Sequence, residues 1–133
     1  MEPIDPRIKL SALWLFVLLN IIFRDLHQFA MKPFLEMLLT GTYHGTEITE
    51  ELMLIGGVLA EVPIAMVPLS LVMTHGVGRF VTSFAALITA ATLVSSAPMD
   101  LDDILHLIME LLAIAAIVWT VWRWPGAPTR PFR

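Results

Sequence analysis

Ionisable side chains interrupt the apolar stretch 101–122 of this 133-residue sequence at helical spacing. They are Asp102, Asp103, His106 and Glu110, which at 100° per residue fall within an arc of about 100° on one helix face. His106 and Glu110 occupy positions i and i+4, where two side chains can share a ligand or a proton. This spacing predicts acid–base or ligand-binding chemistry on one side of the helix.

A second polar stripe lies in the apolar stretch 8–31, where Asn20, Arg24, His27 and Gln28 share another arc of about 100°. One alternative for Arg24 is that its long side chain snorkels toward the headgroups. Asn20, deeper in the same stripe, favours a polar face turned toward the interior of a bundle.

Glu61 is the one charge in the middle of the stretch 50–73. It follows Glu50 by eleven residues and therefore lies about 16 Å along the helix, near the middle of a bilayer. A charge there costs about 2.5–3.5 kcal/mol and usually faces a bundle interior or pairs with another charge. We expect Glu61 either to line a polar pocket or to be a buried partner of Arg24.

These side chains all fall in the same half of one predicted bundle, which predicts a single acidic pocket open to the outer side. Carboxylates in apolar surroundings hold protons nearer neutral pH, where imidazole also exchanges them, so the pocket suits acid–base chemistry on a lipophilic substrate. The candidate catalytic residues are Glu61, Glu110, His106 and Arg24. The candidate substrate-binding residues are Asn20, His27, Gln28, Asp102 and Asp103.

Three classes of function fit such a pocket. The first is an acid–base enzyme or binder of a small lipophilic molecule that enters from membrane lipid. The second is an oligomeric carrier or channel for a cation or proton. The third is an accessory subunit in which Arg24 and the carboxylates form a structural ion network. A homo-oligomer is expected mainly for the carrier.

No cofactor is predicted, and a metal ion is the weaker alternative. Its nitrogen and oxygen ligands would be His27, Glu61, His106 and Glu110. The Glu-x-x-His pairs of di-iron helix bundles are absent from the sequence.

The composition determines what kind of element must position these residues. Hydrophobic side chains make up 57% of the chain and charged ones 15%, with a mean hydropathy of +0.78. Both percentages are shifted from soluble domains toward membrane proteins. Eight Lys and Arg against twelve Asp and Glu argue against nucleic acid as a partner. The absence of Cys excludes disulfides, thiolate metal sites and Cys nucleophiles.

Four apolar stretches are long enough to cross a bilayer, which takes about 20 residues per helix. The sequence therefore predicts an all-α fold, a four-transmembrane-helix bundle in a single domain over residues 1–124. The predicted helices are 8–31, 50–73, 80–97 and 101–122, followed by a flexible cytoplasmic tail at 125–133. Between the first two, residues 33–39 are expected to form a short interfacial helix and 40–46 a turn.

The cations gather at helix ends on one side of the predicted bundle: Arg7, Lys9, Arg79, Arg123, Arg130 and Arg133. The positive-inside rule then places both termini in the cytoplasm, in a multi-pass protein of the cytoplasmic (inner) membrane. Four tryptophans lie toward the same side, as interfacial anchors would: Trp14, Trp119, Trp122 and Trp124. The first stretch is too long for a cleaved signal peptide, and its N-terminal flank is not net positive.

Three strings on these helices carry a resemblance: Phe23-Arg-Asp-Leu-His27, Glu61-Val-Pro-Ile64 and Pro98-Met-Asp-Leu-Asp-Asp103. They resemble an uncharacterised family of short bacterial four-helix integral membrane proteins, over about residues 8–124. The resemblance implies the topology alone. More loosely, the chain is similar to DoxX-like and EXPERA (sterol-isomerase) four-helix bundles, a likeness at the level of fold.

Overall fold

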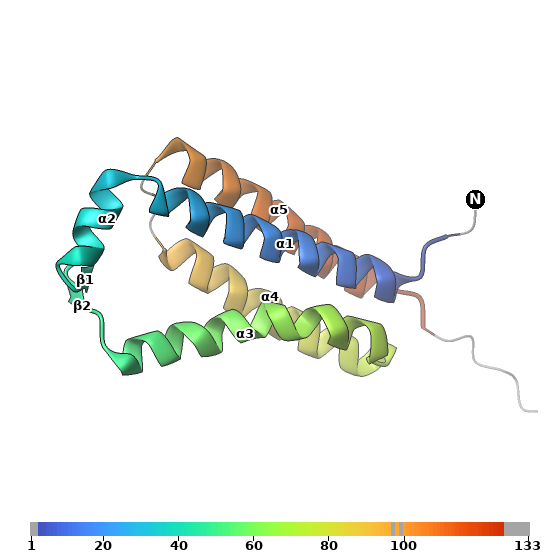
Figure 1. The fold of residues 1–133 in the computed structure, drawn as a ribbon. Helices are drawn as coiled ribbons and strands as arrows, with labels where there is room; N and C mark the ends of the chain where they lie inside the picture. Colours follow the sequence, from blue (N-terminus) through green and yellow to red (C-terminus); the bar gives the residue numbers. More distant parts are fainter. Residues whose placement is uncertain (1–2, 97, 99, 127–133) are drawn as a thin grey trace, which may run out of the picture.

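The structure, a computed structural model, describes residues 3–96, 98 and 100–126. Of the predicted tail at 125–133, residues 127–133 lie outside the described residues. Five helices and a two-stranded hairpin follow one another along the chain (Figure 1). Their bounds are α1 Pro6–Phe29, α2 Lys32–Leu39, β1 Thr42–Tyr43, β2 Thr46–Glu47, α3 Glu50–Val72, α4 His75–Ser95 and α5 Leu101–Arg123. The all-α class predicted from the sequence is confirmed.

Local hydrogen bonds explain where three of the long helices begin. The side chain of Asp5 accepts from Arg7 N, that of Thr49 from Leu52 N, and that of Asp100 from Asp103 N. Each satisfies a backbone N–H that has no partner inside its helix.

The four long helices form a bundle in which neighbours in sequence are also neighbours in space. α1 packs on α3 and α5, and α4 packs on the same two helices, so α1 and α4 lie on one diagonal. All four are long and apolar enough to cross a membrane. α2 and the hairpin lie at one end of the bundle, here called the α2 end, and the N-terminus lies at the other, the termini end (Figure 1).

The core includes Leu10, Trp14 and Val17 of α1, packed near Ile117 and Val121 of α5, and it reaches Leu93 near the α2 end of α4. Small residues of α4, Ala85 and Ala86, belong to the same cluster and let the helices approach closely. Trp14 is 0% exposed. The prediction that it anchors the membrane interface is therefore wrong, because its position on the α1 stripe turns it inward.

The other tryptophans meet arginines at the termini end. Arg123 stacks on Trp119 with its guanidinium carbon 4.2 Å from the ring centroid, and Arg79 and Arg7 stack on Trp122 and Trp124 at 5.4 and 5.7 Å. Cations on aromatic rings are typical of a membrane–water interface.

α4 begins at His75, five residues before the predicted Phe80, and ends at Ser95 rather than residue 97. The predicted span starts after Arg79 because it contains no charged residue. The helix instead carries Arg79 into the interface, where the guanidinium reaches the carbonyls of Trp122 and Trp124.

The segment between α1 and α3 contains the predicted short helix and, beyond the prediction, a hairpin. Thr42 pairs with Glu47 and Tyr43 with Thr46. His44 and Gly45 between them have φ of 47° and 79°, the pattern of a tight type I′ turn.

Candidate functional site

A buried polar network joins α1 to α5 in the half of the bundle toward the α2 end. Arg24 Nη1 donates to Glu110 Oε2 at 3.4 Å, and Arg24 Nε lies 3.9 Å from Asp103 Oδ1. Gln28 Nε2 donates to both oxygens of Asp103, at 3.1 and 3.3 Å. Arg24 is 6% exposed, Asp103 1% and Glu110 0%. Arg24 therefore points into the bundle and does not snorkel.

This network holds two carboxylates against one guanidinium. A buried guanidinium is tolerated only where anions compensate its charge. Because both anions lie on α5, Arg24 holds α1 against α5. One oxygen of Glu110, Oε1, is buried without a hydrogen-bond partner among the described residues.

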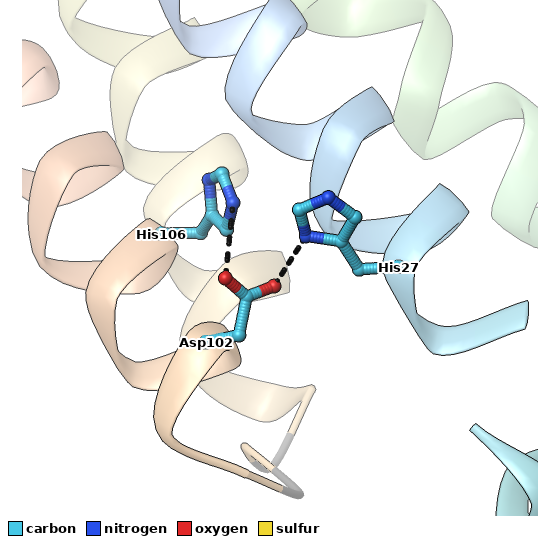
Figure 2. A group of neighbouring side chains, drawn as sticks. All are labelled: His27, Asp102 and His106. Atoms are coloured by element: carbon cyan, nitrogen blue, oxygen red, sulfur yellow. Dashed lines mark hydrogen bonds and ion pairs between the residues drawn. The ribbon is translucent and has the colours of Figure 1, made fainter. Parts of the chain in front are cut away.

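A second cluster lies beside the network and nearer the surface. His27 and His106 point toward the carboxylate of Asp102, the first from α1 and the others from α5 (Figure 2). His27 Nδ1 is 2.6 Å from Asp102 Oδ2, and His106 Nε2 is 3.8 Å from Asp102 Oδ1. On its other side, His106 Nδ1 lies 3.0 Å from Asn20 Oδ1. The three side chains could together hold a metal ion.

A cleft of about 170 Å³ opens between α1, α3 and α4. Most of its wall is apolar or small, and two adjacent charged residues of α1, Arg24 and Asp25, complete it. The remaining lining residues are Ile21, Gly56, Leu59, Ala60, Pro63, Thr89, Thr92, Leu93 and Ser96. Arg24 thus belongs both to the buried network and to the wall of this cleft.

The cleft exists because α3 packs closely only from Pro63 onward. Its buried residues are Pro63, Met66 and Ser70, whereas Met53, Leu54 and Val58 are 60–68% exposed. In Figure 1 the α2-end half of α3 diverges from α1 and α4.

Glu61 does not join the other predicted residues. It is exposed on α3, outside the cleft lining, and makes no hydrogen bond or ion pair with any residue that the structure describes. The predicted pairing of Glu61 with Arg24 is therefore wrong, because Arg24 turns toward α5 and Glu61 turns away from the bundle.

The remaining predicted site residues gather at the interface of α1 and α5, but in two groups. Arg24, Gln28, Asp103 and Glu110 form the buried network, and Asn20, His27, Asp102 and His106 form the outer cluster. The predicted metal ligands Glu61 and Glu110 do not belong to the group that the two histidines form. The carboxylate in that group is Asp102.

Asp25 is not among the residues predicted for the site. It lies outside the arc of the α1 stripe, and this displacement turns it to the cleft on the other side of Arg24. The signal that could have identified Asp25 is an acidic residue in a membrane helix that lies outside the main polar stripe of that helix.

The chain was also compared with known proteins. A family described as "Family of unknown function (DUF6326)" matches residues 5–124. The chain belongs to this family. Searches of curated proteins and of solved structures found no match. The family assignment supports the resemblance to an uncharacterised family, while the likeness to DoxX-like and EXPERA proteins and the bacterial origin stay predictions.

Proposed function

We propose that this member of the family binds a small lipophilic molecule with a basic polar group in the cleft between α1, α3 and α4. The observation that carries the proposal is the carboxylate of Asp25 on the wall of an otherwise largely apolar cleft. Asp25 forms no hydrogen bond or ion pair with another residue that the structure describes. Pockets for small molecules combine apolar walls with a few polar groups in this way.

The charges near the cleft favour a cationic head group over an anionic one. Arg24 already has Glu110 and Asp103 on its far side, so its charge is compensated before any ligand arrives. Asp25 adds a further carboxylate that faces the cleft. Asp25 is exposed at the cleft, and a protonated amine would give its carboxylate a charge-assisted hydrogen bond.

An apolar groove would accommodate the rest of such a molecule. The groove has a volume of about 330 Å³, lies between the hairpin and α3, and shares Gly56 and Leu59 with the cleft. Its other lining residues are Leu38, Tyr43, Ile48, Leu52, Met53 and Ile55. A molecule with its head at Asp25 can therefore extend its chain past Gly56 toward the surface.

The residue that could exchange a proton with a ligand in this cleft is Asp25. Glu110 lies behind Arg24, His106 belongs to the outer cluster, and Glu61 is on the outside of α3. The catalytic role expected for those three residues is therefore not part of this proposal.

The test compares an alkylamine with the alcohol and the carboxylate of the same chain length, using the purified full chain in lipid nanodiscs. At a free concentration about tenfold above Kd, a bound ligand stabilises the fold by about 1.4 kcal/mol, which raises Tm by about 4 °C. We expect the amine to give this shift, the alcohol less and the carboxylate the least.

Asp25→Asn should remove the preference for the amine, and Gly56→Phe should weaken all three ligands. A Cβ at Gly56 meets nothing within 4 Å, and a ring attached there would occupy space that the cleft and the groove share. Glu61→Gln is the matched control, because it removes an exposed carboxylate outside the cleft. Equal shifts for the three ligands, or an amine preference that survives Asp25→Asn, would contradict the proposal.

Proton or cation passage is a second candidate, favoured by polar atoms buried deep in the bundle. Thr82 Oγ1, Thr89 Oγ1 and Glu110 Oε1 have no hydrogen-bond partner among the described residues. Buried polar atoms of this kind often bind water, and bound waters would extend a polar path from Glu110 toward the termini end. Flux into liposomes should then fall in Glu110→Gln and not in Glu61→Gln. Folded wild-type protein without flux would reject this candidate.

A further inference from the structure

We propose that His27, Asp102 and His106 form a binding site for a divalent first-row metal ion such as Zn²⁺ at the α2 end of the bundle. One nitrogen from each histidine and one carboxylate oxygen all lie within 4.8 Å of one another. Two imidazoles and a carboxylate are ligands that such ions take readily. The site is separate from the cleft, since His27 follows Asp25 by two residues and lies about 200° further around α1.

Hydrogen bonds at Asn20 determine which nitrogen of His106 is free. Asn20 Nδ2 donates to the carbonyl of Phe16 at 2.9 Å, and a carbonyl can only accept, so the amide has one possible orientation. Asn20 Oδ1 then faces His106 Nδ1 at 3.0 Å and must accept a hydrogen bond from its N–H. The neutral ring therefore carries its lone pair on Nε2, the nitrogen turned toward Asp102.

This arrangement leaves two acceptors facing each other. His106 Nε2 and Asp102 Oδ1 are 3.8 Å apart, too far for a hydrogen bond between them. A cation between them satisfies both, and the hydrogen bond from Asn20 is the kind of outer contact that orients a metal-binding histidine.

The distances fit a metal after small side-chain rotations. With metal–ligand bonds of about 2.1 Å in tetrahedral geometry, neighbouring ligand atoms are about 3.4 Å apart. His27 Nδ1 lies 2.6 Å from Oδ2 of Asp102 and His106 Nε2 lies 3.8 Å from Oδ1, so the carboxylate must rotate to offer one oxygen to both rings. One ligand atom from each residue lies within 4.8 Å of the others, so no separation must shorten by more than about 1.4 Å. The side chains of His27 and Asp102 are 56% and 39% exposed and can make this adjustment, while His106 is held by Asn20.

The surroundings favour a cation and leave room for water as a fourth ligand. Asp103 and Glu110 lie in the adjacent network with one guanidinium between them, so the local charge is negative. The side chains of His27 and Asp102 are both exposed, which gives the ion a path of entry.

The experiment titrates the purified full chain in detergent with Zn²⁺ by calorimetry and with Co²⁺ by visible absorption. The expected result is one ion per chain and a Co²⁺ spectrum of four-coordinate type. His27→Gln, Asp102→Asn and His106→Gln should each lower the affinity at least tenfold. Asn20→Leu, which removes the group that orients His106, should lower it by about 10- to 100-fold.

Two other histidines supply matched controls. His44→Asn changes an exposed histidine of the hairpin, and Asn tolerates the positive φ of this position. His75→Gln changes the histidine beside Trp124 at the termini end. Both should bind the ion as the wild type does. His27→Gln, at the most exposed ligand, keeps the test decisive if a buried variant fails to fold. Wild-type protein that binds neither ion below millimolar concentration, or His27→Gln with unchanged affinity and spectrum, would overturn the proposal.

Discussion

Arg24 joins α1 to α5 in the half of the bundle toward the α2 end. It contacts two carboxylates that are almost fully buried, Glu110 and Asp103. Arg24→Met leaves both without their cation, and breaking a buried pair of this kind costs about 3–5 kcal/mol. We expect Arg24→Met to accumulate poorly and to unfold at a much lower denaturant concentration, measured by helical circular dichroism in detergent.

The double variant Arg24→Met/Glu110→Leu tests the reason for that loss. Removing one carboxylate together with the guanidinium leaves less uncompensated charge, so part of the stability should return. A double variant no more stable than Arg24→Met would show that Glu110 is not the partner that matters.

Glu61 should behave in the opposite way, because it is exposed on α3 and no partner for it is described. A carboxylate facing lipid is costly, so Glu61→Leu should leave the stability unchanged or raise it. The same denaturation assay measures this. A clear loss of stability in Glu61→Leu would mean that a group outside the described residues contacts Glu61.

These two residues show how far spacing along the chain can predict a site. The arcs on α1 and α5 follow from 100° per residue, and they correctly gathered polar side chains at one interface. Whether Arg24 could pair with Glu61 depended on how α3 is rotated about its own axis. Because small and acidic residues spread over more than half of the circumference in the first half of α3, its sequence pattern did not determine that rotation.

At the scale of elements, the end of α5 is completed by α4. Arg79 Nη2 donates to the carbonyls of Trp122 and Trp124, which have no partner further along the helix. Arg79→Leu removes these hydrogen bonds and the ring contact with Trp122. We expect faster amide hydrogen exchange over the last turn of α5, measured by mass spectrometry, with the rest of the bundle unchanged.

Lys9→Leu is the control for that experiment, since it removes a cation near the same end of the bundle without touching α5 carbonyls. Equal exchange in wild type and Arg79→Leu would mean that the last turn of α5 does not depend on Arg79, since His75 Nε2 also contacts the carbonyl of Trp124 at 2.7 Å. Arg79 also explains why the predicted start of α4, at residue 80, is wrong. An arginine whose guanidinium has backbone partners can extend a helix into the membrane interface instead of ending it.

At the scale of the whole molecule, composition was sufficient to predict an all-α chain with four helices that can cross a membrane. It was not sufficient to predict the cleft. The divergence of α3 arises from the packing of Pro63, Met66 and Ser70 at one end only, while the apolar residues at the other end would suit either lipid or protein.

The orientation of the bundle in the membrane is the remaining prediction at this scale. Arginines and tryptophans gather at the termini end, so the positive-inside rule places residues 3–5 in the cytoplasm and the hairpin outside.

The chain has no Cys, so a single introduced cysteine reports on one position without background. A membrane-impermeant maleimide applied to intact cells should label Glu47→Cys, in β2, and should label Ile4→Cys only after the membrane is opened. Both positions are exposed in the structure, so burial within the protein would not account for a difference between them. Labelling of Ile4→Cys from outside would reverse the orientation and would place the cleft and the histidine cluster at the cytoplasmic side.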